Sequence, residues 1–327
     1  MNELTLDWLA LDRLRTVFLG GTAGDHDYWR GESDLASYDA TFAQRIGWKW
    51  DCVLYELERR GWTPPPGTAL LDWGCGSGIA ARALLDFFGK ERATKASFWD
   101  RSALAMRFAA DRARDKYAGL TVDTGLPARP ELVLISHVLT ELTVEQTEAL
   151  VKWLEPAVAV LWVEPGTYDA SRRLVAVRER LNGTFHVVAP CTHGAGCGML
   201  APGNEVHWCH HFAATPPAVF TDPFWGRFAQ ASGVDLRSLP LSFLVLDKRP
   251  APALPTGTVR VIGRPRVYKA HASVLACDAA GVGEYELLKR RLPAMFRRFR
   301  KDDCPPLQIW TREGGRVIEA EELPDGT

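Results

Sequence analysis

The first residues whose types and spacing could do chemistry form a glycine-rich run. Residues 70–78 read Leu-Leu-Asp-Trp-Gly-Cys-Gly-Ser-Gly, so Asp72 ends an apolar stretch and Gly74, Gly76 and Gly78 follow at alternate positions. Glycine lets a backbone turn sharply and approach a ligand closely. Open α/β sheets bind ligands beyond the carboxyl ends of their strands. The run therefore predicts a nucleotide-type site, and the alternative is a tight strand–helix turn without a ligand.

The spacing of these glycines differs from that of pyrophosphate-binding loops. The run is G-x-G-x-G rather than G-x-G-x-x-G, and no Lys-Ser or Lys-Thr pair follows it to hold phosphate. The next predicted strand ends in Asp100, 22 residues after Gly78. A carboxylate at that position can accept hydrogen bonds from both ribose hydroxyls. Its alternative role is that of a helix N-cap.

A strand that ends in an acid and is followed by G-x-G-x-G resembles motif I of the class I S-adenosylmethionine (SAM) methyltransferases. In that superfamily the end of the fourth strand lies beside the methionine part of the cofactor and the methyl acceptor. Here those residues are Ser136 and His137, and a packed histidine is the alternative for His137. No general base is identifiable, so the catalytic residue is unknown. The predicted cofactor-binding residues are Asp72, Gly74, Gly76, Gly78, Asp100, Ser136 and His137.

A second group that could do chemistry is a cluster of cysteines. Three of the seven, Cys191, Cys197 and Cys209, fall within 19 positions. Clustered cysteines in an intracellular chain favour metal binding or redox chemistry over disulfides. Thiolates suit zinc or iron–sulfur clusters, and both need four ligands. The fourth would be Cys277 or one of the histidines His193, His207, His210 and His271.

The spacing of the cysteines does not choose the metal, and three unrelated buried cysteines are the alternative. Pro190-Cys191 also has the form of a nucleophilic cysteine for methyl transfer to a ring carbon, but it comes later in the chain than that nucleophile usually does.

The elements that must position these residues alternate between strands and helices after residue 68. We expect helices in residues 1–62, with one amphipathic helix over 34–62 that Pro64-Pro65-Pro66-Gly67 ends. Strands are predicted at 69–73, 96–99, 132–136, 158–163, 185–189 and 241–246, and helices at 79–88, 102–117, 144–154 and 171–181. This alternation predicts a mainly parallel sheet covered on both faces. Residues 190–240 show little periodicity, and a metal would hold such a loop.

The predicted fold class is α/β: a class I SAM-methyltransferase-like (Rossmann-like) sheet with an N-terminal helical extension, a cysteine-rich metal-binding insertion and a small β-rich C-terminal module. The predicted boundaries are 1–66 for the helical region, 67–250 for the methyltransferase-like domain with its insertion at about 190–240, and 251–327 for a basic module.

Composition and charge exclude several classes of protein. Apolar residues make up 46% of the 327 residues, which is enough for a core, and Lys+Arg and Asp+Glu number 39 and 40, a net charge of −1. No global field therefore draws the chain to nucleic acid or membrane. No apolar run is long enough for a transmembrane helix, and the N-terminus lacks the plan of a signal or transit peptide. We expect a cytoplasmic protein with neither a membrane nor DNA as partner.

Charge is nevertheless uneven along the chain. Residues 251–301 carry eleven Lys/Arg and three Asp/Glu, a net charge of +8. Basic side chains attract phosphate, and interleaved aromatic side chains can stack on unpaired bases. The predicted RNA-binding residues are Lys289, Arg290, Arg291, Arg297, Arg298 and Arg300. The alternative is a solvated helix face whose apolar residues pack in the core.

A longer series of motifs points to one family. Val163-Glu164-Pro165-Gly166-Thr167, then 188–193 (Val-Ala-Pro-Cys-Thr-His), Cys197 and 208–212 (Trp-Cys-His-His-Phe) follow in order. The series resembles the mitochondrial ribosomal small-subunit methyltransferase-like family (Rsm-twenty-two type, which includes methyltransferase-like protein seventeen) and its bacterial homologues. The chain departs from the family in having Cys197-Gly198-Met199-Leu200 where Cys-Pro-Leu is usual.

The resemblance implies a SAM-type fold with a [4Fe–4S] cluster, acting on or binding small-subunit ribosomal RNA or its precursor during ribosome assembly. By motif, the cluster ligands are Cys191, Cys197, Cys209 and Cys277, whereas Cys304 lies outside the matching motif. Two other functions stay open. One is a non-catalytic assembly factor with a vestigial SAM site, and the other is a zinc-stabilised methyltransferase with a non-RNA substrate.

Overall fold

The computed structural model describes residues 6–20, 24 and 26–324. The chain forms two compact units. Unit 1 takes residues 1–55, 63–164 and 213–239, and unit 2 takes residues 56–62, 165–212 and 240–327. The domain boundaries predicted from the sequence, 66/67 and 250/251, stay a prediction, and each unit draws on separate stretches of the chain.

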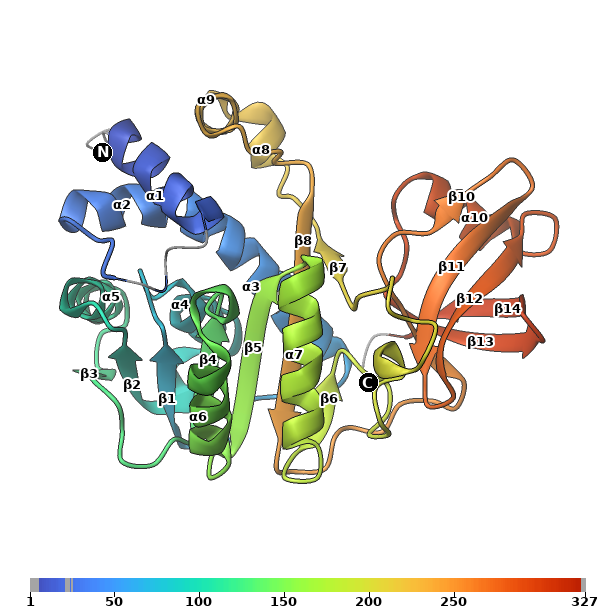
Figure 1. Ribbon diagram of the computed structural model, residues 1–327, viewed down its shortest axis with the longest axis horizontal. Coiled ribbons are helices and arrows are strands. Elements are labelled where there is room, and N and C mark those ends of the chain that lie inside the picture. Colours follow the sequence, from blue (N-terminus) through green and yellow to red (C-terminus); the bar gives the residue numbers. More distant parts are fainter. Residues whose placement is uncertain (1–5, 21–23, 25, 325–327) are drawn as a thin grey trace. The chain divides into compact units, whose positions relative to one another are not determined.

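Unit 1 contains a parallel sheet with the order β3-β2-β1-β4-β5 (Figure 1). Its strands are β1 (Thr68–Trp73), β2 (Ala93–Trp99), β3 (Thr121–Thr124), β4 (Leu132–Ser136) and β5 (Ala159–Pro165). The helices between them are α4 (Ile79–Phe88), α5 (Ala103–Lys116) and α6 (Val144–Leu154), and the short 3-10 helices are η1 (Lys90–Arg92) and η2 (Leu139–Glu141). Leu70 pairs with Ala96 on one side and with Leu132 on the other. The strand order thus reverses at β1, which makes the edge between β1 and β4 a topological switch point.

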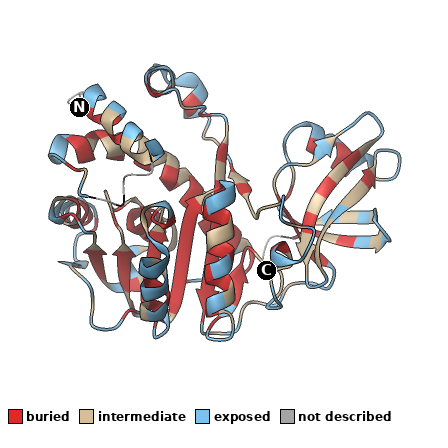
Figure 2. Ribbon diagram, viewed as in Figure 1, coloured by how far each residue is buried: buried red, intermediate tan, exposed pale blue. Residues whose placement is uncertain are grey.

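Burial explains the hydrophobic patterns of this sheet. Most residues of β1, β4 and β5 are buried. Figure 2 shows β5 buried along its length, whereas α6 carries both exposed and buried residues. Strands that helices cover on both faces have no polar side to present to water. The helix α6 begins at a capping box, in which Thr143 and Gln146 exchange side-chain and backbone hydrogen bonds.

The N-terminal region is helical but differs from the predicted single helix over 34–62. It forms α1 (Trp8–Gly20), α2 (Glu32–Ala40) and α3 (Phe42–Arg59). The chain breaks at Thr41, where φ is −128° and ψ is −88°. Because α2 and α3 each bury one face, apolar residues recur at helical spacing on both sides of Thr41. The periodicity of the sequence therefore did not reveal the break between the two helices.

The expectation of an irregular segment over 190–240 is wrong for its second half. Residues 213–239 belong to unit 1 and contain α8 (Ala218–Thr221) and α9 (Pro223–Ser232). Asp222 caps α9 by accepting from the Phe224 N–H, Pro223 is its first residue, and Gly233 ends it at φ 62°. Trp225 and Phe228 belong to a buried apolar cluster through which this pair of helices packs in unit 1. The Asp-Pro start and the glycine stop were the signals in the sequence.

Unit 2 contains α7 (Tyr168–Leu181), η3 (Gly198–Leu200), the antiparallel pair β6 (His186–Ala189) and β8 (Leu239–Asp247), and β7 (His211–Ala213), which pairs with β8. It also contains the predicted β-rich C-terminal sheet, with the order β10-β11-β12-β14-β13-β9. These strands are β9 (Thr258–Val261), β10 (Arg266–Val267), β11 (His271–Asp278), β12 (Gly281–Leu288), β13 (Leu307–Glu313) and β14 (Arg316–Glu322). The helix α10 (Pro293–Arg300) packs on this sheet through Met295, Phe296 and Phe299. Within the described residues, no helix combines the length and the apolar content needed to cross a membrane.

Candidate functional site

The glycine-rich loop follows β1 and is held against the end of β2. Gly74, Gly76 and Gly78 all have positive φ, at 70°, 50° and 78°. The N–H groups of Gly74 and Cys75 donate to the Trp99 carbonyl at 2.8 and 3.0 Å, and the Gly76 N–H donates to Asp100 Oδ2 at 3.0 Å. Because L-residues rarely adopt positive φ, this loop needs glycine at all three positions.

The three glycines differ in the space around them. A Cβ on Gly74 would lie 2.6 Å from Val138 Cγ1, and one on Gly78 would lie 2.9 Å from the Ala109 Cβ. A Cβ on Gly76 would meet nothing within 4 Å. Gly74 and Gly78 therefore let neighbouring elements approach, whereas Gly76 leaves an open cradle above the loop.

Two buried polar atoms of this loop lack a hydrogen-bond partner among the described residues: Asp72 Oδ1 and Ser77 Oγ. Asp72 is fully buried, and its Oδ2 accepts from the Ala81 N–H at 3.1 Å. Burial raises the pKa of Asp72 to about 7. Unpaired buried polar atoms are costly, so a ligand that brings hydrogen-bond donors into the cradle would satisfy them. An aminoacyl nucleoside such as SAM fits this requirement.

Asp100 supports the loop as well as facing the cradle. Its Oδ1 accepts from the Ser102 N–H at 2.9 Å while Oδ2 accepts from Gly76. The N-cap of α5 is Ser102, whose side chain accepts from the Ala105 N–H, so the simple N-cap alternative for Asp100 does not hold. Burial raises the pKa of Asp100. Each carboxylate oxygen keeps a second lone pair, which leaves capacity for ribose hydroxyls.

Ser136 and His137, at the end of β4, are both in contact with α3. Trp50 Nε1 donates to Ser136 Oγ at 3.0 Å, and Lys49 Nζ lies 3.3 Å from His137 Nε2. His137 has φ 57°, which is uncommon for a residue with a Cβ. The sequence did not point to Lys49, because a single lysine in an amphipathic helix carries no local signal.

Glu164 was quoted for the family motif but was not predicted as a site residue. It is fully buried at the end of β5. Its Oε1 accepts from the N–H groups of Val138 and Leu139 at 3.0 and 3.1 Å and from Trp162 Nε1 at 2.7 Å. Oε2 lacks a partner in the described part of the chain, and burial raises the pKa of Glu164 to about 7. Glu164 thus fixes the turn that carries His137.

The cysteines that the sequence singled out all lie in unit 2, and all seven cysteines of the chain are thiols. Burial raises the pKa of Cys209 well above its ordinary value, and the charges of Cys191, Cys197 and Cys277 each affect that pKa. Burial also raises the pKa of Cys277 to about 12, and Cys191 and Cys197 add to this shift. The four thiols are therefore close enough to interact electrostatically. Among the described residues, however, no three His, Cys, Asp or Glu side chains converge in an arrangement that could hold a metal ion.

Specific contacts hold the backbone around these thiols. Arg60 donates to the carbonyls of Val188, Pro190 and Cys191 at 2.7, 2.7 and 2.9 Å. The hydroxyls of Ser171 and Ser242 both donate to the Cys209 carbonyl at 2.7 Å. These bonds anchor two of the four candidate ligands at the main chain.

A close approach brings the second cysteine to the β11–β12 hairpin. A Cβ on Gly198 would lie 2.6 Å from the Val282 nitrogen, and Val282 is the register partner of Cys277. Glycine after Cys197 thus lets the loop reach the strand pair that carries Cys277. A proline-containing Cys-Pro-Leu turn would not pack here in the same way.

Donors and imidazoles surround the thiols. Arg178 Nε donates to Cys191 Sγ at 3.3 Å, and His193 Nε2 lies 3.6 Å from Cys277 Sγ. His211 Nε2 lies 3.6 Å from Cys209 Sγ. His193 was among the histidines predicted as a fourth ligand, whereas His211 was not. The other three predicted histidines have different roles: His210 stacks on Trp208 and His271 stacks on Tyr268, while His207 lies in the loop before them.

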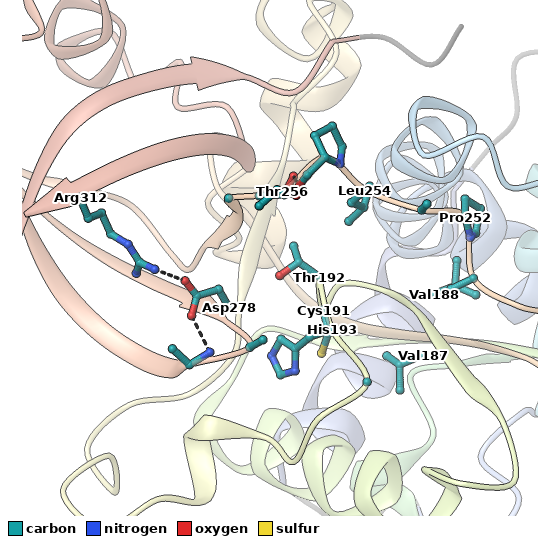
Figure 3. A pocket seen from close by; sticks show the side chains of 18 residues that line it. Val187, Val188, Cys191, Thr192, His193, Pro252, Leu254, Thr256, Asp278 and Arg312 are labelled. Atoms are coloured by element: carbon teal, nitrogen blue, oxygen red, sulfur yellow. Dashed lines mark hydrogen bonds and ion pairs between the residues drawn. The ribbon is translucent and has the colours of Figure 1, made fainter.

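A cavity that borders this segment has a volume of about 610 Å³. Its walls are residues 191–194, the proline-rich stretch 251–258 and the turn 278–280 (Figure 3). Asp278 lines it and binds both Arg312 and the Ala280 N–H. Cavities of this size accommodate small molecules, and this one reaches Cys191 and His193.

The basic side chains predicted to bind RNA differ in their exposure, and RNA binding itself stays a prediction. Five of the six predicted RNA-binding side chains are exposed: Lys289, Arg290, Arg291, Arg297 and Arg300. Arg298 is half-buried and forms ion pairs with Asp303 at 2.9 Å and Glu322 at 2.6 Å. Phe296 and Phe299 lie in the core, as the alternative reading of this segment has it, and are not available to stack on bases. Their spacing is that of an amphipathic helix whose apolar face packs on a sheet.

The strand order, the glycine loop at the switch point and the unpaired Asp72 define a class I SAM-methyltransferase-like protein. A family model described as "Mitochondrial small ribosomal subunit Rsm22" matches residues 53–304. The chain belongs to this family, as its motifs suggested. No curated protein matches the chain.

Solved structures with similar folds include two methyltransferases. Magnesium protoporphyrin IX methyltransferase (ChlM) from Synechocystis PCC 6803 with bound SAM is 12% identical, covers 76% of this chain and 100% of its own, and has a TM-score of 0.40. The plantazolicin methyltransferase BpumL in complex with SAH is 12% identical, covers 74% of this chain and 100% of its own, and has a TM-score of 0.36. These likenesses are remote, and the fold class stands on the strand order and the loop.

Proposed function

We propose that this protein binds SAM and an iron–sulfur cluster and acts on, or binds, small-subunit ribosomal RNA during ribosome assembly. The observation that carries the proposal is the open space above Gly76, with the unpaired oxygen of the buried Asp72 in the same loop, in a chain of the Rsm22 family. If this loop had only a packing role, we would expect its buried carboxylate oxygen to be paired, because buried polar atoms in proteins usually are. Its place at a topological switch point is where open α/β sheets bind ligands.

SAM would be held by the predicted residues of unit 1. The cradle above Gly76 would take the nucleoside, Asp100 would accept from its ribose hydroxyls, and Asp72 would lie near the amino-acid part. When bound, SAM supplies an electrophilic methyl group on a sulfonium centre. Ser136 and His137 lie at the end of β4, where the methyl acceptor would approach.

The cluster would be held by Cys191, Cys197, Cys209 and Cys277. Four soft thiols are the donor set that a [4Fe–4S] cluster requires. They do not converge on a metal site among the described residues, so the family resemblance carries this part of the proposal. Arg178 Nε donates to the Cys191 sulfur at 3.3 Å. The raised pKa values of Cys209 and Cys277 are those of bare thiols, and bound iron would remove their protons.

The ribosomal role rests on the family description and on the exposed basic side chains of residues 289–300. These side chains would contact phosphates, because the aromatic residues between them are buried. The cytoplasmic location remains a prediction from the sequence. The family description refers to the mitochondrial subunit, and cell fractionation with antibodies to the chain decides between the two.

Metal analysis of anaerobically purified protein tests the cluster. We expect about four iron and four sulfide per chain, since a [4Fe–4S] cluster has that composition. Cys277→Ser should lose them, whereas the matched control Cys304→Ser, at a half-buried cysteine outside the set, should keep them. One zinc per chain without sulfide would refute the cluster and favour a zinc-stabilised protein.

Calorimetric titration with SAM and mass spectrometry of small-subunit rRNA from a deletion strain test the rest. SAM binding that Asp72→Asn weakens, together with the loss of one rRNA methyl group in the deletion strain, is the expected result. Unchanged rRNA with stalled small subunits would identify a non-catalytic assembly factor. Absence of SAM binding would refute the cofactor.

A further inference from the structure

A buried lysine–histidine pair lies at the end of the sheet where the methyl acceptor would approach. Lys49 has 8% of its surface exposed, and its Nζ lies 3.3 Å from His137 Nε2. Lys49 comes from α3 and His137 from the end of β4, 88 positions later. Lysine is rarely buried without a carboxylate partner, and no carboxylate in the described residues forms an ion pair with this one.

The surroundings of this pair favour an uncharged amine. Arg45, one helical turn before Lys49, adds a like charge, whereas Glu164 on β5 is the acid that opposes it. Burial, with a smaller contribution from the charge of Arg45, lowers the pKa of Lys49 to about 7, although Glu164 acts in the opposite direction. Burial together with both cations also lowers the pKa of His137 well below its ordinary value. Near neutral pH the pair therefore consists of a neutral imidazole and an amine of which a substantial fraction is unprotonated.

The backbone holds the pair in place at a conformational cost. His137 is kept at φ 57°, and Glu164 binds the N–H groups of the next two residues. Trp50, the residue after Lys49, binds Ser136. Residues held in unfavourable conformations concentrate at functional sites, where the surrounding structure compensates for their strain. The Trp50–Ser136 hydrogen bond thus holds this part of α3 at the end of β4, and Glu164 holds the turn that carries His137.

We infer that Lys49 is the general base of the methyl transfer, with His137 as the residue that positions it. The inference rests on the proposed function and deepens it, because a base is needed only when the attacking atom carries a proton. The substrate group is therefore an amino or hydroxyl group, and not a ring nitrogen that lacks hydrogen.

The step balances as follows. A lone pair of the acceptor atom forms a bond to the methyl carbon, and the carbon–sulfur bond breaks with its electron pair left on sulfur, which gives S-adenosylhomocysteine. The proton of the acceptor atom passes to Lys49 Nζ and then to water. When His137 Nε2 accepts a hydrogen bond from the amine, the lone pair of Lys49 stays available for this proton.

The test measures SAM binding and methyl transfer separately on the full-length protein. Radiolabelled SAM and small subunits from a deletion strain are the substrates, and rates are measured from pH 5.5 to 9. We expect the wild-type rate to rise through about pH 7 and then level off, as the base loses its proton. Lys49→Met should bind SAM as the wild type does but transfer methyl about 100- to 10,000-fold more slowly. The matched control, Lys152→Met at an exposed lysine of α6, should change neither quantity.

Arg45→Gln provides a readout that a merely structural lysine would not give. Loss of the like charge should raise the pKa of Lys49 and move the midpoint of the pH–rate profile to higher pH. Asn tolerates positive φ, so His137→Asn should keep the turn and SAM binding but lower the rate.

The inference would be overturned if Lys49→Met transferred methyl at the wild-type rate. It would also be overturned if Arg45→Gln left the midpoint of the pH–rate profile unchanged. Either result would leave the proposed function intact. Wild-type protein that binds SAM but methylates no subunit would overturn both the enzymatic function and the base.

Discussion

Replacing Glu56 by glutamine should lower the free energy of unfolding of unit 2 by more than the substitution of an exposed residue does. Glu56 lies between Arg60 and Arg260. Its Oε1 is 2.8 Å from Arg60 Nη2, and its two carboxylate oxygens are each 2.5 Å from Arg260 Nη1. The side chains are 7%, 2% and 3% exposed, respectively. Removing one partner of a buried ion pair leaves an uncompensated charge and costs about 3–5 kcal/mol. Here two guanidiniums lose their shared carboxylate, so we expect about 5 kcal/mol.

The effect should reach the cysteine segment because Arg60 also holds three carbonyls there. Without Glu56, the Arg60 guanidinium loses the bond that orients it toward Val188, Pro190 and Cys191. Equilibrium urea unfolding followed by tryptophan fluorescence measures the loss of stability. Hydrogen exchange measured on peptides that cover 186–193 should show faster exchange in Glu56→Gln. The matched control is Glu58→Gln, at an exposed glutamate of the same helix.

The pH dependence gives a further check with a definite sign. Burial alone would raise the pKa of Glu56, but the charges of Arg260 and Arg60 outweigh it and lower that pKa. The stability that the carboxylate contributes is therefore present above its ordinary pKa of 4.5 and is lost as the pH falls through the lower, folded-state pKa. The difference between the wild type and Glu56→Gln should shrink in acid. A difference below about 1 kcal/mol at pH 7, within the range of exposed pairs, would refute the reasoning.

Three further predictions concern the cradle and the basic segment. The Asp72 pKa rises from 3.8 to about 7 on folding, so Asp72→Asn should stabilise the ligand-free protein by about 4 kcal/mol above pH 7 and by little below pH 4; unfolding at pH 4 and pH 8 checks this, and an equal gain at both would contradict it. Gly78→Ala, which meets Ala109, should lower the unfolding temperature more than Gly76→Ala, which carries only about 1–2 kcal/mol of left-handed strain; equal shifts in a thermal scan would argue against the packing. Neutralising residues 289–291 should weaken rRNA binding and flatten its salt dependence, whereas Arg298→Gln, already paired with acids, should change it less; filter binding at several salt concentrations decides.

The sequence determined the elements whose signals are local. The helices 79–88 and 144–154 and the strand 132–136 have the predicted bounds, because apolar periodicity and flanking turn residues occur within a few positions of one another. The glycine loop could also be recognised in the sequence, from three glycines at alternate positions directly after a predicted strand. The positive φ at each of them is the physical reason why glycine stands there. Residues 218–232 show the limit, because their start and stop signals were present but short apolar stretches between prolines gave no period to recognise.

Only the tertiary structure decided which distant residues meet. Lys49 and His137 are 88 positions apart, and Glu56 and Arg260 are 204 apart. Nothing near either member in the sequence marks it as one of a pair. Their roles depend on burial, and burial is a property of the packed chain. On an exposed helix face the same lysine would keep its ordinary pKa. The same glutamate would not stand out among the 40 acidic residues of the chain. Residue type and spacing thus specify a local conformation, whereas desolvation and the distance between side chains, which set pKa values and ion-pair energies, exist only once the chain has folded.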